Sequence, residues 1–239
     1  MSKLNIILPC AGAGTRLGLP YPKEVFILEQ DKALIDYTFS ALLTEKDFVK
    51  SVTIVLTPEK VSIVSYLKKW SDYFYIRFCY FNPKYTEWAG SIRSSAEDFS
   101  DKNVVLLPDS IITPEKGCPI LGKFDELLNE NDIVFAYKFE KDPDKLKNLG
   151  AVEISAAGAV KRFCDKPQSK HELYNAFWCS FGFRKEIGDS LLQMMQNSIA
   201  KKSVDLADIS KKIGSFPVES YRDLGTWESI EGFHRIRNE

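Results

Sequence analysis

The chain has 239 residues, 44% of them hydrophobic, which suits one large α/β domain of ordinary globular composition. Its 32 lysines and arginines balance 33 aspartates and glutamates to a net charge of −1. We therefore expect no nucleic-acid partner, and we expect no membrane association because no apolar run reaches membrane-spanning length. The five cysteines are scattered, without C-x-x-C or zinc spacing, which indicates free thiols and a cytoplasmic location.

Apolar, strand-like segments alternate with helical patterns in the first half of the chain. Strands are predicted at residues 4–9, 51–56, 73–81 and 104–109, and helices at residues 33–43 and 58–70. This alternation is typical of βαβ units. The predicted fold class is therefore α/β, a Rossmann-like three-layer α/β/α arrangement around a mostly parallel, mixed central sheet. In such sheets the ligand binds beyond the carboxyl ends of the strands.

The second half of the chain contains more hairpin and turn signals. The pattern predicts strands at residues 132–139, 175–183 and 215–220, a hairpin at 150–164, two helical pieces over 185–213, and a final helix from Thr226. No repeat, low-complexity tract or linker separates the two halves. We therefore expect residues 1–239 to form a single domain that includes a hairpin region at residues 140–185.

A loop rich in glycine and alanine follows the first predicted strand and leads to two cations. Its glycines allow the backbone to approach a ligand and leave N–H groups free to face it. Arg16 and Lys23 suit a polyphosphate, the arginine as a planar fork and the lysine as a point charge. From spacing alone, a tight surface turn with two solvated cations is an equally good interpretation.

Two other phosphate-binding loops do not fit this sequence. No string matches the G-x-x-x-x-G-K-[ST] pattern of a P-loop. A dinucleotide fingerprint needs G-x-G-x-x-G, but Gly18 lies one residue too far from Gly12 and Gly14. The second predicted strand also ends in Thr57 and Pro58 rather than in an acidic residue. An NAD-linked oxidoreductase is therefore the weaker hypothesis.

The loop resembles the G-x-G-T-R…P-K signature of nucleotidyltransferases, and most closely that of the sugar-1-phosphate nucleotidyltransferases. Four later segments follow in that family's order. They are V-V-L-L-P-D ending at Asp109, a hairpin ending in Asp165-Lys166-Pro167, the strand at residues 175–183, and R-D-L-G-T around Asp223. Each motif is short, but their order and spacing together are specific, and they span the chain.

The resemblance implies an enzyme that joins an NTP to a phosphorylated acceptor and releases pyrophosphate. It implies catalytic roles for Arg16 and Lys23, and a Mg²⁺ ion held by Asp109 and Asp223. The implied nucleotide-binding residues are Pro9, Ala11, Gly12, Ala13, Gly14, Thr15, Gly90, Ser91 and Asp109. The implied acceptor-binding residues are Gly150, Asp165, Lys166 and Trp178, which makes residues 140–185 an acceptor-side hairpin region.

Several of these residues have structural alternatives. Asp109 could form a turn after its strand, and Asp223 could cap the final helix. Trp178 lies in an alternating aromatic run, for which core packing is the more common use. A catalytically inactive, nucleotide-sugar-binding homologue is a further hypothesis. It is disfavoured by four intact residues, Arg16, Lys23, Asp109 and Asp223.

The sequence combines features of two groups within the family. Six residues separate Arg16 from Lys23, and this short spacing resembles that of methylerythritol-phosphate cytidylyltransferases, as does the segment Gly90-Ser91…Ser94. L-L-P-D and D-L-G-T instead resemble uridylyl and thymidylyl sugar enzymes. Asp165 stands where relatives usually carry glutamate. The resemblance therefore predicts a pyrimidine nucleotide, with CTP slightly favoured, and a sugar or polyol phosphate as acceptor; it also allows a homo-oligomer.

Overall fold

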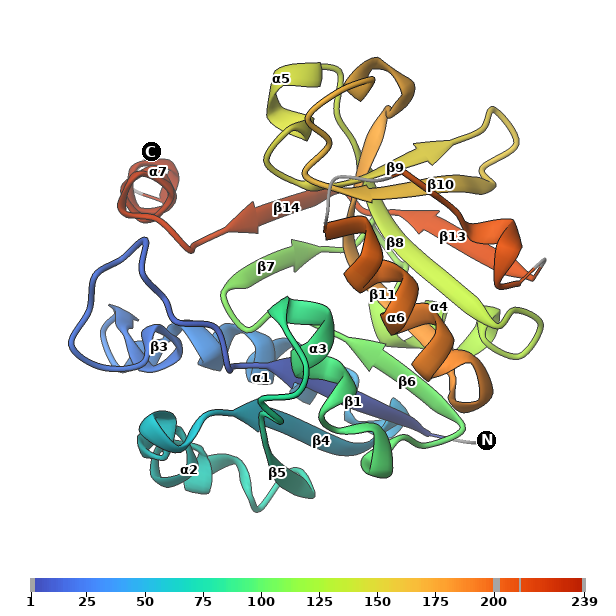
Figure 1. The fold of residues 1–239 in the computed structure, drawn as a ribbon. Helices are drawn as coiled ribbons and strands as arrows, with labels where there is room; N and C mark the ends of the chain where they lie inside the picture. Colours follow the sequence, from blue (N-terminus) through green and yellow to red (C-terminus); the bar gives the residue numbers. More distant parts are fainter. Residues whose placement is uncertain (1–2, 200–202, 211, 238–239) are drawn as a thin grey trace.

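A ten-stranded mixed sheet lies at the centre of the computed structural model, which describes residues 3–199, 203–210 and 212–237 (Figure 1). The first half of the chain contributes parallel strands in the order β6-β1-β4-β5. These strands are β1 (Leu4–Pro9), β4 (Val49–Leu56), β5 (Ile76–Tyr80) and β6 (Lys102–Val105). The predicted α/β fold class, with its mostly parallel mixed sheet, is confirmed.

A long strand, β11 (Ala176–Arg184), joins these strands to the second half of the chain. One edge of β11 pairs antiparallel with β8 (Ile133–Phe139), which pairs in turn with β13 (Ile213–Pro217). The other edge pairs with β6 near the end of β11 and with β9 near its start. The sheet therefore divides at β11 into the main sheet and a hairpin wing. The hairpin wing consists of β9 (Gly150–Ile154), β10 (Val160–Asp165) and β12 (Val204–Asp205).

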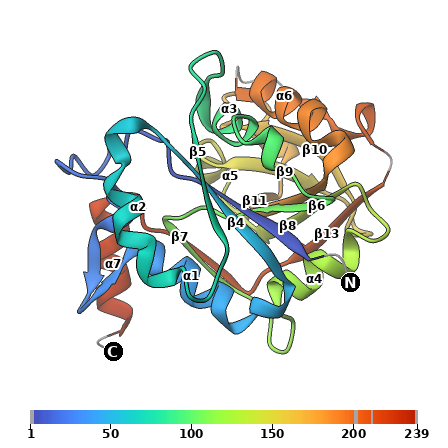
Figure 2. The same ribbon diagram turned by 90° about the horizontal axis from the view of Figure 1, so that it is seen from below.

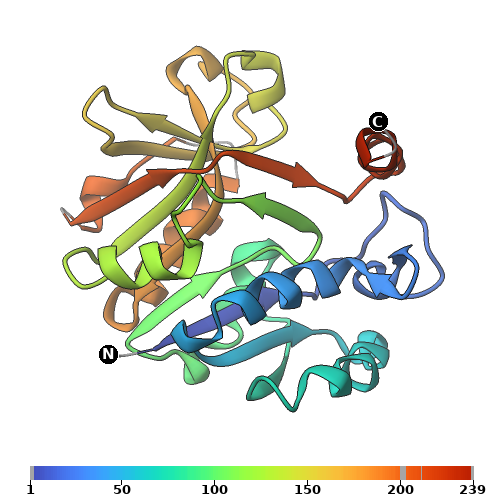
Figure 3. The same cartoon turned by 180° about the vertical axis from the view of Figure 1, so that it is seen from behind.

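Helices cover both faces of the sheet, as Figures 1 and 3 show from opposite sides. One face carries α1 (Leu34–Thr44) and α4 (Ile120–Leu127), and the other carries α3 (Glu87–Arg93) and α6 (Gly188–Ile199). The side chains of β1 alternate between the two cores: Ile6 packs on the α1 side and Ile7 on the α3 side. Because both faces are covered, this strand is a continuous apolar run rather than an alternating one.

A two-stranded ribbon lies beside the main sheet and leads into the last helix. It pairs β7 (Ser110–Thr113) with β14 (Ser220–Asp223), and α7 (Trp227–Arg237) follows it. Figure 2 shows α7 beside β3 and α1. Phe233 of α7 joins Leu28 in a small separate core, so segments from the two ends of the sequence pack together. The remaining short strands and α-helices are β2 (Ile27–Glu29), β3 (Lys32–Ala33), α2 (Ser62–Tyr66) and α5 (Pro143–Leu146).

The prediction of a second helical piece before residue 213 is wrong for the described residues. β12, a 3-10 turn at Leu206–Asp208 and the start of β13 occupy this segment, while residues 200–202 and 211 lie outside the described residues. The reason is tertiary. Val204 pairs with the open edge of β10, and Ile213 pairs with the open edge of β8. Pairing at an available edge satisfies the backbone of a segment whose own pattern does not decide its conformation.

Other boundaries differ from the predictions by local chemistry. The predicted strand at 104–109 ends at Val105, and Asp109 lies in the turn before β7. The predicted strand at 215–220 is divided between the end of β13 and the start of β14. The sequence did not predict α3, which carries the Gly90-Ser91 segment. In the described part of the chain, no helix has the length and apolar character needed to cross a membrane.

Candidate active site

A cleft of about 970 Å³ opens at the carboxyl ends of β1, β5 and β6, the edge at which parallel sheets bind ligands. The loop after β1, the β7–β14 ribbon, α3 and the hairpin wing contribute its walls. Every residue assigned a site role from the sequence lines this cleft, except Gly90. The lining residues from that set are Pro9, Ala11, Gly12, Ala13, Gly14, Thr15, Arg16, Lys23, Ser91, Asp109, Gly150, Asp165, Lys166, Trp178 and Asp223.

Gly90 has a packing role instead. It is buried inside α3, where an added Cβ would lie 2.7 Å from Cβ of Tyr85. Glycine is therefore needed for the close approach of Tyr85 to the helix. Its neighbour Ser91 does line the cleft, so the structure brings half of the predicted pair into the site.

Local hydrogen bonds and the last helix hold the glycine-rich loop in place. The Cys10 N–H donates to the Val55 carbonyl at 2.7 Å, and the Leu17 N–H donates to the Gly14 carbonyl at 3.2 Å. Gly14 has a φ of +67°, a left-handed conformation that favours glycine. From α7, Trp227 Nε1 donates to the Leu17 carbonyl at 3.1 Å. The loop is therefore fixed at both its start and its end.

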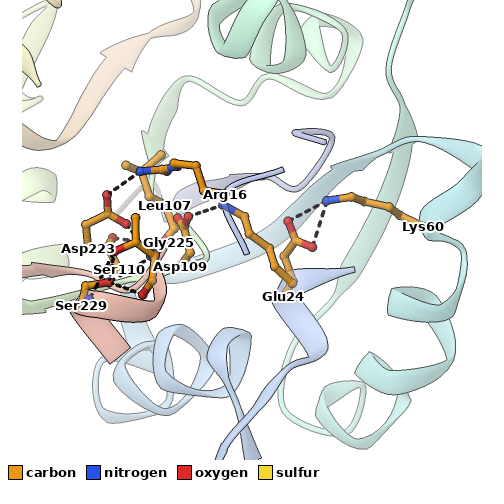
Figure 4. A network of polar contacts seen from close by, with 11 residues as sticks. Arg16, Glu24, Lys60, Leu107, Asp109, Ser110, Asp223, Gly225 and Ser229 are labelled. Atoms are coloured by element: carbon orange, nitrogen blue, oxygen red, sulfur yellow. Dashed lines mark hydrogen bonds and ion pairs between the residues drawn. The ribbon is translucent and has the colours of Figure 1, made fainter. Parts of the chain in front are cut away.

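Two pairs of cations and carboxylates lie beside this loop (Figure 4). The Lys23 ammonium donates a hydrogen bond to Asp109, and Arg16 Nη1 lies 3.5 Å from Oδ2 of Asp223. The two aspartates are neighbours because the Leu224 N–H, just after β14, donates to the Asp109 carbonyl at 2.8 Å. The ribbon thus brings together carboxylates that are far apart in the sequence.

Gly225 leaves room for the second pair. Its N–H donates to Asp223 Oδ1 at 2.7 Å. A Cβ added at Gly225 would lie 2.8 Å from both Arg16 Nη2 and Asp223 Oδ1. The glycine of the D-L-G-T segment is therefore explained by the close approach of the Arg16 guanidinium.

The charges of the two aspartates shift the pKa values of their neighbours. Burial lowers the pKa of Lys23, but the charge and hydrogen bond of Asp109 outweigh it, so the net shift is upward. Burial, followed by the charges of Asp223 and Asp109, raises the pKa of Tyr221 well above its ordinary value. Lys23 therefore stays a cation, and Tyr221 stays a neutral phenol that also lines the cleft.

A buried ion pair lies directly behind Lys23. The Lys60 ammonium donates to both carboxylate oxygens of Glu24, at 2.9 and 3.0 Å, and Glu24 is 1% exposed (Figure 4). Burial raises the pKa of Glu24, while Lys60 lowers it. Burial also raises the pKa of the Cys10 thiol, so this cysteine is not a nucleophile. The Glu24–Lys60 pair anchors the backbone that carries Lys23 to the segment after β4.

Asp109 and Asp223 are the side chains best placed to hold a metal ion. The described residues contain no cluster of three or more His, Cys, Asp or Glu side chains suited to a metal. Mg²⁺ tolerates this, since it usually binds through one or two carboxylates and completes its shell with waters and phosphate oxygens. The donor set therefore fits Mg²⁺ that is bound together with a nucleotide.

The hairpin wing and α3 provide the opposite wall of the cleft. Trp178 packs against Trp88, with ring centroids 5.2 Å apart and planes tilted by 40°. Gly150 lies against the Trp178 indole, where an added Cβ would overlap Nε1 and lie 2.5 Å from Cδ1. Trp178 is 8% exposed and also lines the cleft. It therefore contributes both to core packing and to the wall of the cleft.

Asp165 is the buried carboxylate of this wall, with 6% of its surface exposed. Burial raises its pKa; the charge of Lys166 and a hydrogen bond from Trp88 lower it, and the charge of Glu87 raises it further. Glu87 and Lys166 have φ values of 61° and 53°, in the left-handed region that residues with a Cβ rarely adopt. Such conformations persist where the surrounding structure imposes them, often at functional sites.

Two buried polar atoms beside the cleft lack a hydrogen-bond partner in the described protein: Ser91 Oγ and Trp178 Nε1. A buried polar group without a partner costs free energy unless a ligand or water satisfies it. Both atoms are therefore candidates for ligand contacts.

Sequence reasoning missed several residues that line the cleft, namely Glu24, Glu87, Trp88 and Tyr221. A signal existed for Tyr221, which precedes Asp223 by two residues and so shares its strand face. No local sequence pattern predicts the Glu24–Lys60 pair. Glu87 and Trp88 could not be predicted either, because their place in the cleft depends on how α3 packs against the hairpin wing.

Comparison with known proteins shows the family of this chain. The family model described as nucleotidyl transferase matches residues 4–237. No curated protein matches the chain significantly. Among solved structures, the chain resembles a Bacillus anthracis protein described as a glucose-1-phosphate thymidylyltransferase, with a TM-score of 0.76, 16% identity, and coverage of 100% of this chain and 96% of that one.

It also resembles a UTP-bound UGPase from Acinetobacter baumannii (TM-score 0.77, 15% identity, 100% of this chain and 95% of that one). A third similar structure is an apo UDP-glucose pyrophosphorylase (TM-score 0.75, 16% identity, 99% of this chain and 100% of that one). At these identities the structural likeness establishes the fold, and the family model establishes the relationship. The chain belongs to the nucleotidyl transferase family and is a nucleotidyltransferase.

Proposed function

We propose that this enzyme is a Mg²⁺-dependent nucleotidyltransferase that joins a pyrimidine NTP to a sugar or polyol phosphate and releases pyrophosphate. One observation carries the proposal. Arg16 and Lys23, at the end of a glycine-rich loop, pair with the neighbouring carboxylates Asp223 and Asp109 in one cleft. These are the charges that a nucleotide triphosphate and its metal ion need.

The reaction forms a bond between an acceptor phosphate oxygen and the α-phosphorus, and breaks the bond from the α-phosphorus to the β-phosphate. A Mg²⁺ ion bound by Asp109 and Asp223 would neutralise phosphate charge. Arg16, 58% exposed at its side chain, reaches the β- and γ-phosphates and stabilises the leaving pyrophosphate. Lys23 stays protonated and holds the α-phosphate or the acceptor phosphate. The acceptor phosphate is already anionic, so no general base is required.

The nucleotide base binds near the loop and Ser91. The unpaired, buried hydroxyl of Ser91 supports this placement, because a base edge would provide its missing partner. A site that satisfies particular polar groups on one base discriminates against a base that leaves them unpaired. A serine hydroxyl both donates and accepts, so it separates cytosine from uracil weakly; CTP is favoured slightly.

The acceptor binds against Gly150, Asp165, Lys166 and Trp178, so residues 140–185 form the acceptor side of a single domain. Lys166 holds the acceptor phosphate. The charge of Lys166 and the adjacent buried carboxylate of Asp165 support this orientation. We also propose a cytoplasmic location, in keeping with the five free cysteines.

Pyrophosphate release tests the proposal. We would measure kcat/KM for CTP, UTP, dTTP, GTP and ATP against a panel of sugar and polyol phosphates, with and without Mg²⁺. We expect Mg²⁺-dependent release with a pyrimidine nucleotide. A preference for GTP or ATP would contradict the pyrimidine assignment alone. Nucleotide binding without release for any acceptor would instead favour the inactive homologue.

A further inference from the structure

The acceptor side of the cleft carries more negative charge and more aromatic surface than a neutral ligand requires. We call six of its lining residues the acceptor wall: Glu87, Trp88, Asn148, Asp165, Lys166 and Trp178. Glu87 and Asp165 lie close enough for the charge of one to act on the other. Among the described residues, no salt bridge joins either carboxylate to a cation, although Lys166 acts on Asp165 from a distance. The acceptor wall thus places two carboxylates together without a paired cation.

Two indole rings lie beside these carboxylates. Trp88 packs on Trp178, and its indole lies near enough to Asp165 to lower the pKa of that carboxyl. The face of a tryptophan ring attracts cations through its quadrupole, and it does so most strongly in a desolvated site. Carboxylates and indole faces together are the usual protein environment of an ammonium group.

A second, independent observation indicates a ligand at this wall. Trp178 Nε1 is buried against Gly150 at the edge of the cleft and has no hydrogen-bond partner in the described protein, so its N–H is a donor that a ligand oxygen or a water would satisfy. The left-handed backbone at Glu87 and at Lys166 is a further sign that the wall is held in a particular shape.

A neutral sugar could donate hydroxyl hydrogen bonds to these carboxylates, but it would leave their two negative charges uncompensated. In the acceptor wall, Asn148 is the one uncharged amide side chain, and the other polar groups are charged or are indole N–H groups. We infer that the acceptor is a small phosphate monoester that carries a cationic nitrogen. Its phosphate lies on Lys166, and its cation lies against the indoles and the carboxylates of Glu87 and Asp165. This inference rests on the proposed function, whose acceptor it specifies.

The test compares cationic acceptors with neutral ones of the same shape. Pyrophosphate release with saturating CTP and Mg²⁺ would be measured for phosphocholine and for its uncharged carbon isostere, 3,3-dimethylbutyl phosphate. Phosphoethanolamine, glucosamine 1-phosphate and glucose 1-phosphate complete the panel and separate amino alcohols from amino sugars. We expect the best cationic acceptor to exceed its uncharged counterpart by at least about tenfold in kcat/KM.

Variants assign the preference to the acceptor wall. Asp165→Asn and Glu87→Gln should each reduce the ratio of cationic to neutral kcat/KM, mainly through KM, while the exposed control Glu130→Gln keeps it. Glu87 is exposed, so its variant tests the acceptor wall independently of the buried Asp165. An equal or higher kcat/KM for the neutral isostere or for glucose 1-phosphate overturns the inference and leaves nucleotidyl transfer intact. Ratios unchanged in both variants also overturn it. Failure of every acceptor overturns the proposed function as well.

Discussion

The two sides of the cleft balance their charges in opposite ways. On the loop side, Lys23 and Arg16 each have a carboxylate partner, so the charges are neutralised within the protein. On the acceptor wall, Asp165 and Glu87 lie near each other without such a pair. A paired site exchanges partners when substrate arrives, whereas an unpaired one depends on its ligand for compensation. Under the proposed function, this difference separates a side of the cleft that acts on the nucleotide phosphates from a side that recognises the acceptor.

The largest expected effect lies on the loop side. Asp109→Asn and Asp223→Asn should each lower kcat by at least about 10³-fold. The loss of one carboxylate charge weakens the binding of the Mg²⁺ ion that neutralises the phosphates. Circular dichroism and thermal unfolding should remain near those of the unmodified enzyme. The exposed Asp31→Asn serves as the control. Near-normal rates in both variants at saturating Mg²⁺ would exclude a two-aspartate site.

Arg16→Ala should have the next largest effect, lowering kcat by about 10²-fold and raising the KM for NTP. Charge grows on the leaving pyrophosphate in the transition state, so this contact should strengthen there. Steady-state kinetics separates the two parameters. A change confined to KM would make Arg16 a ground-state clamp.

Gly150→Ala should damage the acceptor wall and the fold together. The new methyl group would overlap the Trp178 indole, and such overpacking costs about 1–3 kcal/mol of stability. The acceptor KM should rise, while NTP affinity should change little. Gly232→Ala is the matched control, since no atom lies within 4 Å of a Cβ added there and alanine favours its helix. Equal unfolding free energies of the two variants would contradict a steric overlap between the new methyl group and the Trp178 indole.

Lys166→Ala should weaken acceptor binding by about tenfold and leave NTP affinity unchanged, since a charged contact is typically worth a few kcal/mol at most. Calorimetry with each substrate separates the two sides of the cleft. Lys161→Ala, on the exposed face of β10, controls for general loss of positive charge. A defect confined to NTP binding would contradict the assignment of Lys166 to the acceptor side of the cleft.

The smallest effect concerns stability and pH. The folded-state pKa of Asp165 is raised above its ordinary value of 3.8, so its ionised form costs stability above the folded pKa. Asp165→Asn should therefore raise the unfolding free energy at pH 7, by about 1 kcal/mol. The gain should shrink as the pH falls from 7 towards 3.8 and Asp165 becomes protonated. Thermal unfolding of the variant and the unmodified enzyme at several pH values measures this gain. A loss of stability of Asp165→Asn at pH 7 would contradict a raised pKa of Asp165.

The contrast between the loop side and the acceptor wall also separates what the sequence could predict from what it could not. The α/β fold, the loop after β1 and the positions of Arg16, Lys23 and Asp109 follow from apolar periodicity and short local motifs. The β12–β13 segment could not be predicted, because open sheet edges determine its conformation. Gly90 was misplaced because close packing on Tyr85 and close approach to a ligand both require glycine.

The acceptor wall shows the limit most clearly. Glu87 and Trp88 lie on α3, while Asp165 and Trp178 lie on strands formed many residues later. Their proximity depends on how β11 divides the sheet, which no local pattern encodes. The Glu24–Lys60 pair could not be predicted for the same reason, since its partners come from two separate 3-10 turns.

The hydrogen bond from Trp227 to Leu17 has a consequence for synthesis of the chain. These residues are 210 positions apart, and Asp223 joins Arg16 across a similar separation of 207. A ribosome must therefore make more than two hundred further residues before the loop acquires its final supports. A chain interrupted before β14 lacks the second carboxylate and the anchor of the loop. Proteolysis or premature termination in this region should thus leave fragments that cannot consume nucleotide.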